Sequence, residues 1–274
     1  MKRKTDYIQE ELREHIATIR VEDDVAYFVN LGDIHWGLCN RELFEETFHY
    51  LMSIPNLYVG IGGDAGNGST KLSKSDVTEE WSVGDKQVFD LAEILKPYAD
   101  RILYIIEGNH WAGRMKHDVF FTPEKMLATL IGRPEIYKGE FCFLYFNVGK
   151  NCFTHFVQHL SPKRDNVWDW VCADVTWREH HHQRYHKEKV VIEHNKFEKL
   201  PVPKVVYEVW SGTFQVYPKY AKYHGYRVGV PGCYICEMRK NSKHKDLFLW
   251  TDEEFQHIFN SKNRRFHINF TKKV

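Results

Sequence analysis

The sequence predicts an α/β fold with mixed sheets, and the spacing of its apolar residues carries that prediction. Three short apolar segments, at 25–31, 57–61 and 101–106, alternate with stretches whose apolar residues recur at helical spacing. Strands that alternate with helices in this way form a parallel sheet. Later segments alternate apolar and polar residues between turn signals, which is typical of further strands. We therefore expect one domain, residues 1–274, with two mixed sheets.

Helices are predicted in the first half at 40–53, 83–98 and 122–131. Asn40 stands where the first of these helices needs an N-cap, and Pro123 suits the first turn of the third. The charged residues 1–24 are expected to form a helix or a lead-in to the first strand.

The second half is expected to supply mostly strands. Gly149 and Lys150 join two alternating segments, 139–147 and 151–158, and so predict a hairpin. A short helix is expected at 165–171. Residues 184–274 are expected to form C-terminal strands and a tyrosine-rich loop. The later strands are predicted at 173–177, 189–193, 205–210, 227–238 and 246–250, with the loop at 217–226.

Composition limits the class of protein. Hydrophobic residues make up 43% of the chain, enough for a sizeable core, and the net charge of +1 gives no overall sign of a nucleic-acid-binding protein. No apolar run approaches the ~20 residues of a membrane span, and no apolar leader follows Met1. We expect a soluble cytoplasmic protein with no membrane partner. The lone Cys233–Cys236 pair lies in a predicted strand, which favours a structural role over a metal site.

Polar side chains follow each of the three predicted parallel strands. Asp33 and His35 follow the first strand, Asp64 the second, and Asn109 and His110 the third. In a parallel sheet these carboxyl ends meet at one edge, where ligands bind. Carboxylates and imidazoles directed at one point suit a divalent metal. The sequence therefore predicts a metal site at this edge.

Two predicted strands of the second half end in histidines in the same way. His159 follows 151–158, while His180 and His182 follow 173–177 with one residue between them. In an extended backbone this pair would point to one side, and His181 would turn away. His155 lies within its strand, and we interpret it as a buried, hydrogen-bonded histidine.

These motifs, in this order, resemble the calcineurin-like metallophosphoesterase superfamily. The family pattern is Asp-x-His, Gly-Asp, Gly-Asn-His, a His, and Gly-His-x-His. In this chain it stands as Asp33-x-His35, Gly63-Asp64, Gly108-Asn109-His110, His159 and Glu179-His180-x-His182. The branch found in phages and bacteria looks most similar, because Trp210-Ser-Gly-Thr-Phe214 and the tyrosine-rich loop follow the last motif. The resemblance implies a two-sheet α/β/β/α sandwich of the metallophosphoesterase type, in a bacterial or phage-infected host cell.

The resemblance further implies a dinuclear centre that hydrolyses phosphoesters with a metal-activated hydroxide. The implied ligands of one ion are Asp33, His35 and His182, and those of the other are Asn109, His159 and His180, with Asp64 between the two. Asp64 would be required for turnover, and His110 would protonate the leaving oxygen or stabilise its charge. Mixed oxygen and nitrogen ligands suit Mn, Fe or Zn, and the sequence does not choose among them.

Three features depart from the family pattern. Glu179 replaces the glycine of the last motif, and would either crowd the backbone turn or place a carboxylate near the metals. Trp111 stands where an acidic residue often follows Gly-Asn-His, and is expected to change the pocket wall. The loop after Asp64 lacks a second acid. Because none of these removes a ligand, we expect an active enzyme. A catalytically degraded binding protein on the same fold is the alternative.

Basic and aromatic residues favour a nucleic acid or nucleotide as substrate, and hence a phosphodiesterase or nuclease. Lys163 and Arg164 follow His159, where they could meet backbone phosphates. Arg114, one helical turn after His110, is a further candidate phosphate contact. Tyrosines interleave with basic residues at 217–227, which suits base stacking beside phosphates. A phosphomonoesterase, and a purely structural role for the 217–226 loop, are the alternatives. The sequence does not indicate an oligomeric state.

Overall fold

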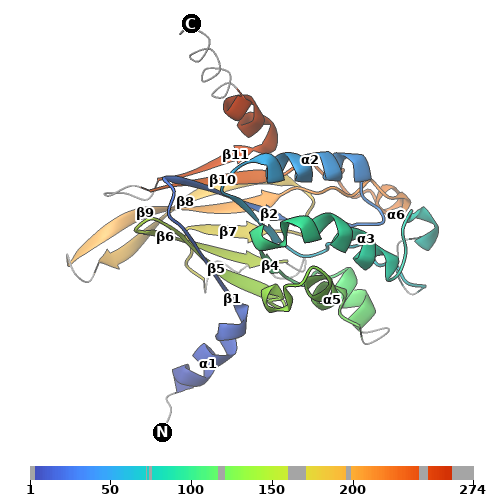
Figure 1. The fold of residues 1–274 in the computed structure, drawn as a ribbon, viewed down its shortest axis with the longest axis horizontal. Helices are drawn as coiled ribbons and strands as arrows, with labels where there is room; N and C mark the ends of the chain where they lie inside the picture. Colours follow the sequence, from blue (N-terminus) through green and yellow to red (C-terminus); the bar gives the residue numbers. More distant parts are fainter. Residues whose placement is uncertain are drawn as a thin grey trace, which may run out of the picture.

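The chain forms a mixed α/β fold in which two mixed sheets are flanked by helices (Figure 1). The predicted fold class is confirmed. This computed structural model describes residues 4–71, 73, 76–116, 121–159, 171–195, 199–240 and 246–260. Within them, no helix is long and apolar enough to cross a membrane.

The five-stranded sheet has the order β11-β10-β2-β3-β4. Its strands are β2 (Val25–Leu31), β3 (Leu57–Ile61), β4 (Ile102–Ile105), β10 (Tyr234–Arg239) and β11 (Asp246–Thr251). β2, β3 and β4 are parallel, while β10 runs antiparallel to both β2 and β11. The predicted parallel core of the first half is therefore confirmed.

Three helices cover the outer face of this sheet, namely α2 (Arg41–Ser53), α3 (Lys86–Leu95) and α5 (Pro123–Leu130) (Figure 1). Phe44, Leu91 and Leu127 carry their apolar faces into a core shared with the strands, and each is fully buried. Asn40 caps α2 by accepting a hydrogen bond from the Leu43 backbone N–H, as predicted. Short 3-10 helices lie at Arg13–His15, Val77–Glu79, Lys96–Arg101 and Pro134–Ile136, and a π-helical turn, η4, at Trp111–Lys116.

The six-stranded sheet has the order β1-β5-β6-β7-β9-β8. Its strands are β1 (Ile16–Val21), β5 (Phe141–Val148), β6 (Asn151–Gln158), β7 (Val175–Arg178), β8 (Arg184–Asn195) and β9 (Leu200–Ser211). β6, β7 and β9 are parallel to one another, and β1 is parallel to β5. The pairs β5–β6 and β8–β9 are antiparallel hairpins.

A second core lies between the two sheets. Phe28 of β2, Phe146 of β5 and Trp177 of β7 meet there and are fully buried. His155 lies in the same layer, 1% exposed, and its Nδ1 accepts a hydrogen bond from Trp177 Nε1 at 3.1 Å. The prediction of a buried, hydrogen-bonded His155 is confirmed.

The structure corrects three sequence assignments. Residues 1–24 contain not only the helix α1 (Lys4–Leu12) but also the strand β1, whose partner β5 lies more than 100 residues away in the chain. The strand predicted over 227–238 begins only at Tyr234, because Pro231 lacks an N–H donor and Gly232 adopts a φ of 104°. The tyrosine-rich loop contains a short helix, α6 (Lys219–Tyr223). The helix predicted at 165–171 lies outside the described residues, apart from Val171.

Candidate metal centre

The carboxyl ends of strands from both sheets bring the candidate ligands together. β2, β3 and β4 supply them from one sheet, and β6 and β7 from the other. Ligand atoms lie within 4.8 Å of one another in three groups: Asp33, His35 and His182; Asp64, His159 and His180; and His35, Asp64 and His110. The first group has the same residues as the set that the family resemblance implies for one ion. The second contains His159 and His180 of the other implied set, together with Asp64.

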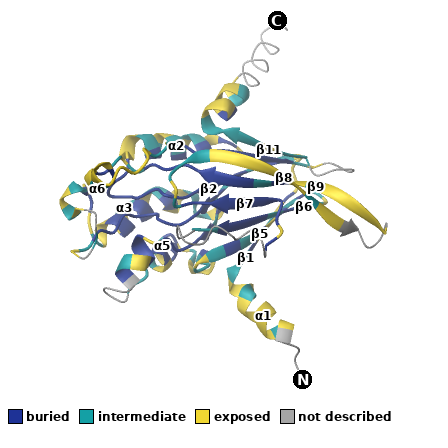
Figure 2. Cartoon of the chain, turned by 180° about the vertical axis from the view of Figure 1, so that it is seen from behind, coloured by how far each residue is buried: buried dark blue, intermediate teal, exposed yellow. Residues whose placement is uncertain are grey.

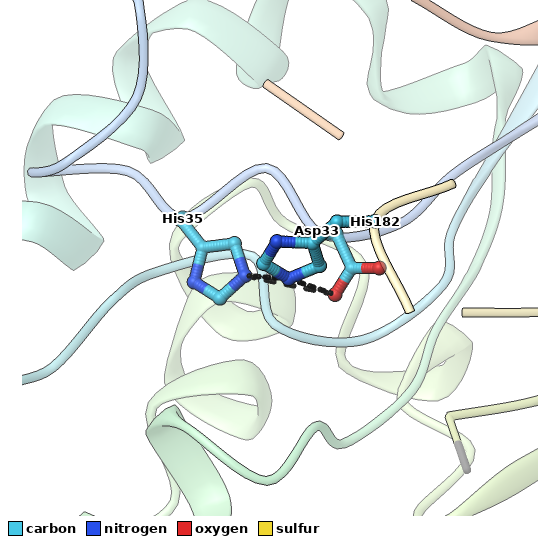
Figure 3. A group of neighbouring side chains, drawn as sticks. All are labelled: Asp33, His35 and His182. Atoms are coloured by element: carbon cyan, nitrogen blue, oxygen red, sulfur yellow. Dashed lines mark hydrogen bonds and ion pairs between the residues drawn. The ribbon is translucent and has the colours of Figure 1, made fainter. Parts of the chain in front are cut away.

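The first group consists of Asp33, His35 and His182 (Figure 3). The Oδ1 atom of Asp33 lies 3.4 Å from His182 Nε2 and 3.6 Å from His35 Nε2. The two Nε2 atoms lie 3.0 Å apart. Three donor atoms therefore converge on one point, two of them nitrogen and one oxygen.

The second group is built around Asp64. Its Oδ2 lies 3.1 Å from His159 Nε2. The side-chain oxygen of Asn109 lies 2.9 Å from His159 Nε2 and 2.7 Å from His180 Nδ1, so the amide joins this group. Asp64 Oδ2 is also 4.0 Å from His35 Nε2 of the first group. The carboxylate of Asp64 thus lies between the two groups.

Each carboxylate has one oxygen held by the backbone and one without a hydrogen-bond partner. Asp33 Oδ2 accepts from the His180 backbone N–H at 2.7 Å, and Asp64 Oδ1 from that of His110 at 2.6 Å. Asp33 Oδ1 and Asp64 Oδ2 are buried and have no hydrogen-bond partner. Buried carboxylate oxygens that accept no hydrogen bond are costly unless a cation, such as an imidazolium or a metal ion, lies beside them. Together with the imidazole nitrogens, these oxygens fit divalent metals such as Mn, Fe or Zn.

Charges within the group keep both carboxylates ionised. Burial opposes ionisation, but the imidazoles of His182 and His35 outweigh it and hold the pKa of Asp33 well below its usual range. In the same way His159 lowers the pKa of Asp64 against the effect of burial. Burial would lower the pKa of His159 itself, yet the two carboxylates raise it to about 10. Two buried negative charges therefore face the point where the donor atoms converge.

Left-handed backbone is concentrated at the candidate ligands. In the described part of the chain, seven non-glycine residues have positive φ, and five of them are Asp33, His35, Asp64, His180 and His182. Each such residue costs roughly 1–3 kcal/mol, and this strain gathers at functional sites. The backbone at His180 and His182 is not extended, so the condition under which the two side chains would point to one side is not met. Their φ values of 82° and 55° turn each side chain toward a different group.

Two motif glycines allow the ligand loops to approach one another. Gly63 has a φ of 94°, and a Cβ there would lie 2.7 Å from His159 Cβ. A Cβ on Gly108 would lie 2.1 Å from the backbone nitrogen of Asp64. Any larger residue would force these loops apart.

Asn67, which the sequence analysis did not single out, orients two histidines. Its Oδ1 lies 3.2 Å from His35 Nδ1 and 3.0 Å from His110 Nδ1. The Asn67 amide nitrogen donates to Glu80 and Ser69, which fixes the oxygen toward the histidines. Both imidazoles therefore donate from Nδ1, and His35 presents the lone pair of Nε2 to the first group. In the sequence, the signal that could have indicated Asn67 is that it is the single amide side chain in the glycine-rich loop after Asp64.

A cleft of about 1160 Å³ opens beside the ligands. Asn109, His110, His180 and His182 lie in its wall. Its described lining includes four basic residues and five large aromatic residues but no Asp or Glu: Arg114, Arg178, Lys187, Arg227, Tyr185, Trp210, Tyr217, Tyr220 and Tyr226. His181 is exposed at the cleft and joins no candidate metal group.

The predicted substrate contacts fall in different places. Arg114 lies in the cleft wall, donating to the Asn67 carbonyl at 2.9 Å and lying 3.3 Å from His110 Nε2. Lys163 and Arg164 lie outside the described residues. His110 is buried, and this burial, with Arg114 and His35 nearby, holds its pKa well below its usual range despite Asp64.

Glu179 turns away from the ligands into the core. Its Oε1 accepts from Ser211 Oγ at 2.6 Å and from the Asn30 amide, and a Cβ on Gly32 would lie 2.3 Å from Glu179 Cδ. The side chain belongs to none of the candidate metal groups. Burial and the nearby Asp33 raise the pKa of Glu179 well above its usual range. Glycine at position 32 therefore makes room for this departure from the family pattern.

Trp111 also lies in the core and does not line the cleft. It is fully buried, and its Nε1 donates to Gln87 Oε1 at 2.9 Å. A Cβ on Gly66 would lie 1.7 Å from the indole, so the ring packs directly on that loop. The expectation that Trp111 changes the pocket wall is wrong. Cys233 and Cys236 are buried free cysteines, outside the candidate metal groups.

No family model matches the chain, and no curated protein matches it in sequence. Some solved structures are similar. Vps29 complexed with Zn²⁺ from Entamoeba histolytica is 12% identical, with a TM-score of 0.37 over 82% of this chain and 99% of that chain. Vacuolar protein sorting 29 from Cryptosporidium parvum is 13% identical, with a TM-score of 0.38 over 84% and 98%. A protein serine/threonine phosphatase from Saccharomyces cerevisiae, with similarity to human phosphatase PP5, is 10% identical, with a TM-score of 0.35 over 82% and 79%.

Proposed function

We propose that the chain is a metal-dependent hydrolase of phosphoester bonds, acting on phosphodiesters of nucleic acids or nucleotides. The observation that carries this proposal is the pair of buried oxygens, Asp33 Oδ1 and Asp64 Oδ2, that lack hydrogen-bond partners and face imidazole nitrogens. Such a donor set holds divalent cations in proteins. It lies beside a cleft large enough for a substrate.

Two sets of residues would hold two ions. They are Asp33, His35 and His182 for one ion, and Asn109, His159 and His180 for the other, with Asp64 shared. When bound, two divalent ions supply electrostatic stabilisation of phosphoryl oxygens and a hydroxide nucleophile at neutral pH. Mn, Fe and Zn all suit these ligands. We also propose the phage or bacterial origin and the cytoplasmic location that the family resemblance implies.

His110 and Arg114 act together on the leaving side of the substrate. The guanidinium lies 3.3 Å from His110 Nε2, and both side chains line the cleft. Arg114 is placed to bind a phosphoryl oxygen through charge-assisted hydrogen bonds. The role that the resemblance implies for His110 is to protonate the leaving oxygen or stabilise its charge. Because Nδ1 is bonded to Asn67 and the pKa is lowered, Nε2 must first take up a proton when a substrate binds.

The cleft favours a nucleic acid over a small monoester. Cations at Arg114, Lys187 and Arg227 would meet backbone phosphates, and no described lining residue is acidic. Tyr220 and Tyr226 offer aromatic rings at the same cleft. Stacking on such rings contributes roughly 1–3 kcal/mol per base. The combination suits a single-stranded segment that passes the metal centre.

An activity panel tests the proposal. The purified protein is assayed on bis(p-nitrophenyl) phosphate, p-nitrophenyl phosphate and a single-stranded oligonucleotide, with Mn, Fe or Zn and with chelator. We expect metal-dependent cleavage of the diester and the oligonucleotide that chelator abolishes. Turnover of the monoester alone would support a phosphomonoesterase instead. Oligonucleotide binding without turnover in any metal would support the non-catalytic alternative.

A further inference from the structure

β8 forms one edge of the six-stranded sheet, and within the described residues it pairs only with β9. The pairing runs without a bulge from Arg184 opposite Ser211 to Asn195 opposite Leu200. The far half of this hairpin projects beyond the rest of the sheet and is exposed (Figures 1 and 2). A long, regular edge strand of this kind readily pairs with another strand.

The projecting half of the hairpin carries an exposed apolar face. Val190 is 63% exposed and Ile192 is 61% exposed. Their partners on β9 are Val205 and Pro203, so the four side chains share one face. Val205 is exposed as well. An apolar cluster on a strand edge marks an interaction surface or an aggregation hazard, and the charges that flank this one distinguish the two.

The charges of β8 are arranged symmetrically about Val191. Lys189 and Glu193 stand two residues to either side, and Val190 and Ile192 stand one residue to either side. We propose that β8 pairs antiparallel with β8 of a second copy of this chain, about a two-fold axis through Val191. Val190 then lies opposite the partner's Ile192, and Lys189 opposite the partner's Glu193. Because of the two-fold axis, the apolar pair and the pair of opposite charges each occur twice.

No neighbouring register satisfies the same conditions. A two-fold axis perpendicular to the sheet places residues of one face opposite each other, so allowed registers centre on single residues. Centring on Val190 sets Glu188 against the partner's Ile192, and centring on Ile192 sets Glu193 against the partner's Val191. Centring on Lys189 brings two lysines together. The charges therefore select one register.

Both charged side chains of this pair are exposed. Glu193 bonds Lys204 within its own chain at 3.0 Å, yet its side chain remains 48% exposed. Lys189 is exposed on the same strand. The assembly would join two six-stranded sheets into one, with the two metal centres roughly 50 Å apart along the strands. Because the contact lies on the far half of the hairpin, this inference does not depend on the proposed function.

Charge exchange tests the pairing by sedimentation of the full-length protein. We expect the wild type to form a dimer, and Lys189→Glu or Glu193→Lys alone to weaken it roughly tenfold or more by placing like charges opposite twice. Mixing the two variants restores both opposite-charge contacts, so a heterodimer of near wild-type affinity should form. Lys150→Glu, on an exposed turn, is the matched control. A wild type that sediments as a monomer, or a dimer insensitive to either variant, would overturn the proposal.

Disulfide trapping tests the register independently. In a Cys172→Ser background, which removes the exposed native cysteine, Val191→Cys should crosslink on oxidation. Directly opposite Cα atoms lie about 4.5–5.5 Å apart, within disulfide reach. Val190→Cys is the control, because its own copy would lie roughly 8 Å away on the diagonal and should not crosslink. Equal crosslinking of both variants, or none at Val191→Cys with the protein folded, would exclude this register.

Discussion

The two sheets contribute differently to the candidate metal centre. From the five-stranded sheet come Asp33, His35 and Asp64, all at most 1% exposed. From the six-stranded sheet come His180 and His182, which are only partly buried, the side chain of His182 being 22% exposed. The loops after β2 and β3 thus supply enclosed ligands, as does β6 with His159, whose side chain is 1% exposed. The loop after β7, together with Asn109 after β4, supplies ligands that open onto the cleft.

The difference follows from the hydrogen bonds that hold each set of ligands in place. Asn67 fixes His35 through a network that includes Glu80 and Ser69, all within one half of the chain. The His180 loop instead depends on contacts with the other sheet, such as the bond of its backbone N–H to Asp33 and that of the Asn30 amide to Glu179. The position of His35 is therefore set within the five-stranded sheet, whereas that of the His180 loop is set by contacts between the two sheets.

The largest effect is expected at Asp64, the carboxylate between the two groups. Asp64→Asn keeps the shape but removes the charge that faces His159 and His35. Turnover should fall roughly a thousand-fold or more, about 4 kcal/mol of barrier. The measurement is the initial rate on a diester in saturating metal. Asp90→Asn, on the surface of α3 beside Lys86, is the control and should retain full activity. Unchanged turnover in Asp64→Asn would exclude a role for this carboxylate.

Asn67 tests whether the first sheet really pre-positions its ligands. Asn67→Ala frees His35 and His110 from their common acceptor, so metal affinity or activity should fall roughly 10–100-fold. Metal titration and steady-state rates measure the two effects separately. Asn147→Ala, which removes an amide that donates to the Ile19 carbonyl far from the centre, is the matched control. Equal behaviour of both variants would mean that Asn67 is not a positioning residue.

Glu179 tests the corresponding support on the second sheet. Glu179→Ala leaves the Asn30 amide and the Ser211 hydroxyl without their acceptor, and should lower the free energy of unfolding by about 1–3 kcal/mol. Glu179→Gln keeps an acceptor of the same shape and should cost less. Urea denaturation compares the two, with exposed Glu22→Ala as control. A Glu179→Ala protein as stable as the wild type would show that the second sheet does not rely on this contact.

Glu124 is expected to affect stability alone, as a dependence on pH. This residue of α5 lies beneath the Gly108 loop, and burial raises its pKa to about 8. Because the folded protein holds this proton more tightly than the unfolded chain, the protonated carboxyl stabilises the folded state fully below its ordinary pKa near 4.5. That contribution to stability is lost as the pH rises through about 8. Glu124→Gln should therefore gain stability relative to the wild type between pH 5 and 8, by up to about 1.4 kcal/mol per pH unit.

Urea denaturation at pH 5 and pH 8 checks the Glu124 prediction. Glu42→Gln, exposed in the first turn of α2, is the control and should follow the wild-type profile. The free energy of unfolding of the wild type is compared with that of Glu124→Gln. If the difference between them is the same at both pH values, a buried, protonated Glu124 is contradicted.

Local pattern predicted the first half of the fold. The apolar strands ending at Leu31 and Ile61, and the Asn40 cap, depend on neighbouring residues and are therefore visible in sequence. β1 was missed because its stability comes from pairing with β5, far away in the chain. The polar residues at strand ends identified the residues that the structure brings together, although their role as ligands stays a prediction.

Three features of the site depend on contacts that no local pattern contains. The backbone at His180 and His182 is left-handed, which the one-residue spacing of the two histidines does not indicate. Because both residues adjoin ligands, the sequence predicts Trp111 at the pocket wall, and Glu179 either crowding the turn or near the metals. Glycines at 66 and 32 let both side chains enter the core.

Metal content of the reconstituted protein tests the central claim most directly. After stripping and reloading with Mn or Zn, elemental analysis should find two ions per wild-type chain. His182→Ala and His159→Ala each disable one group and should each reduce the content toward one ion. A wild-type content of zero, or one ion that persists in both variants, would contradict a dinuclear centre at these strand ends.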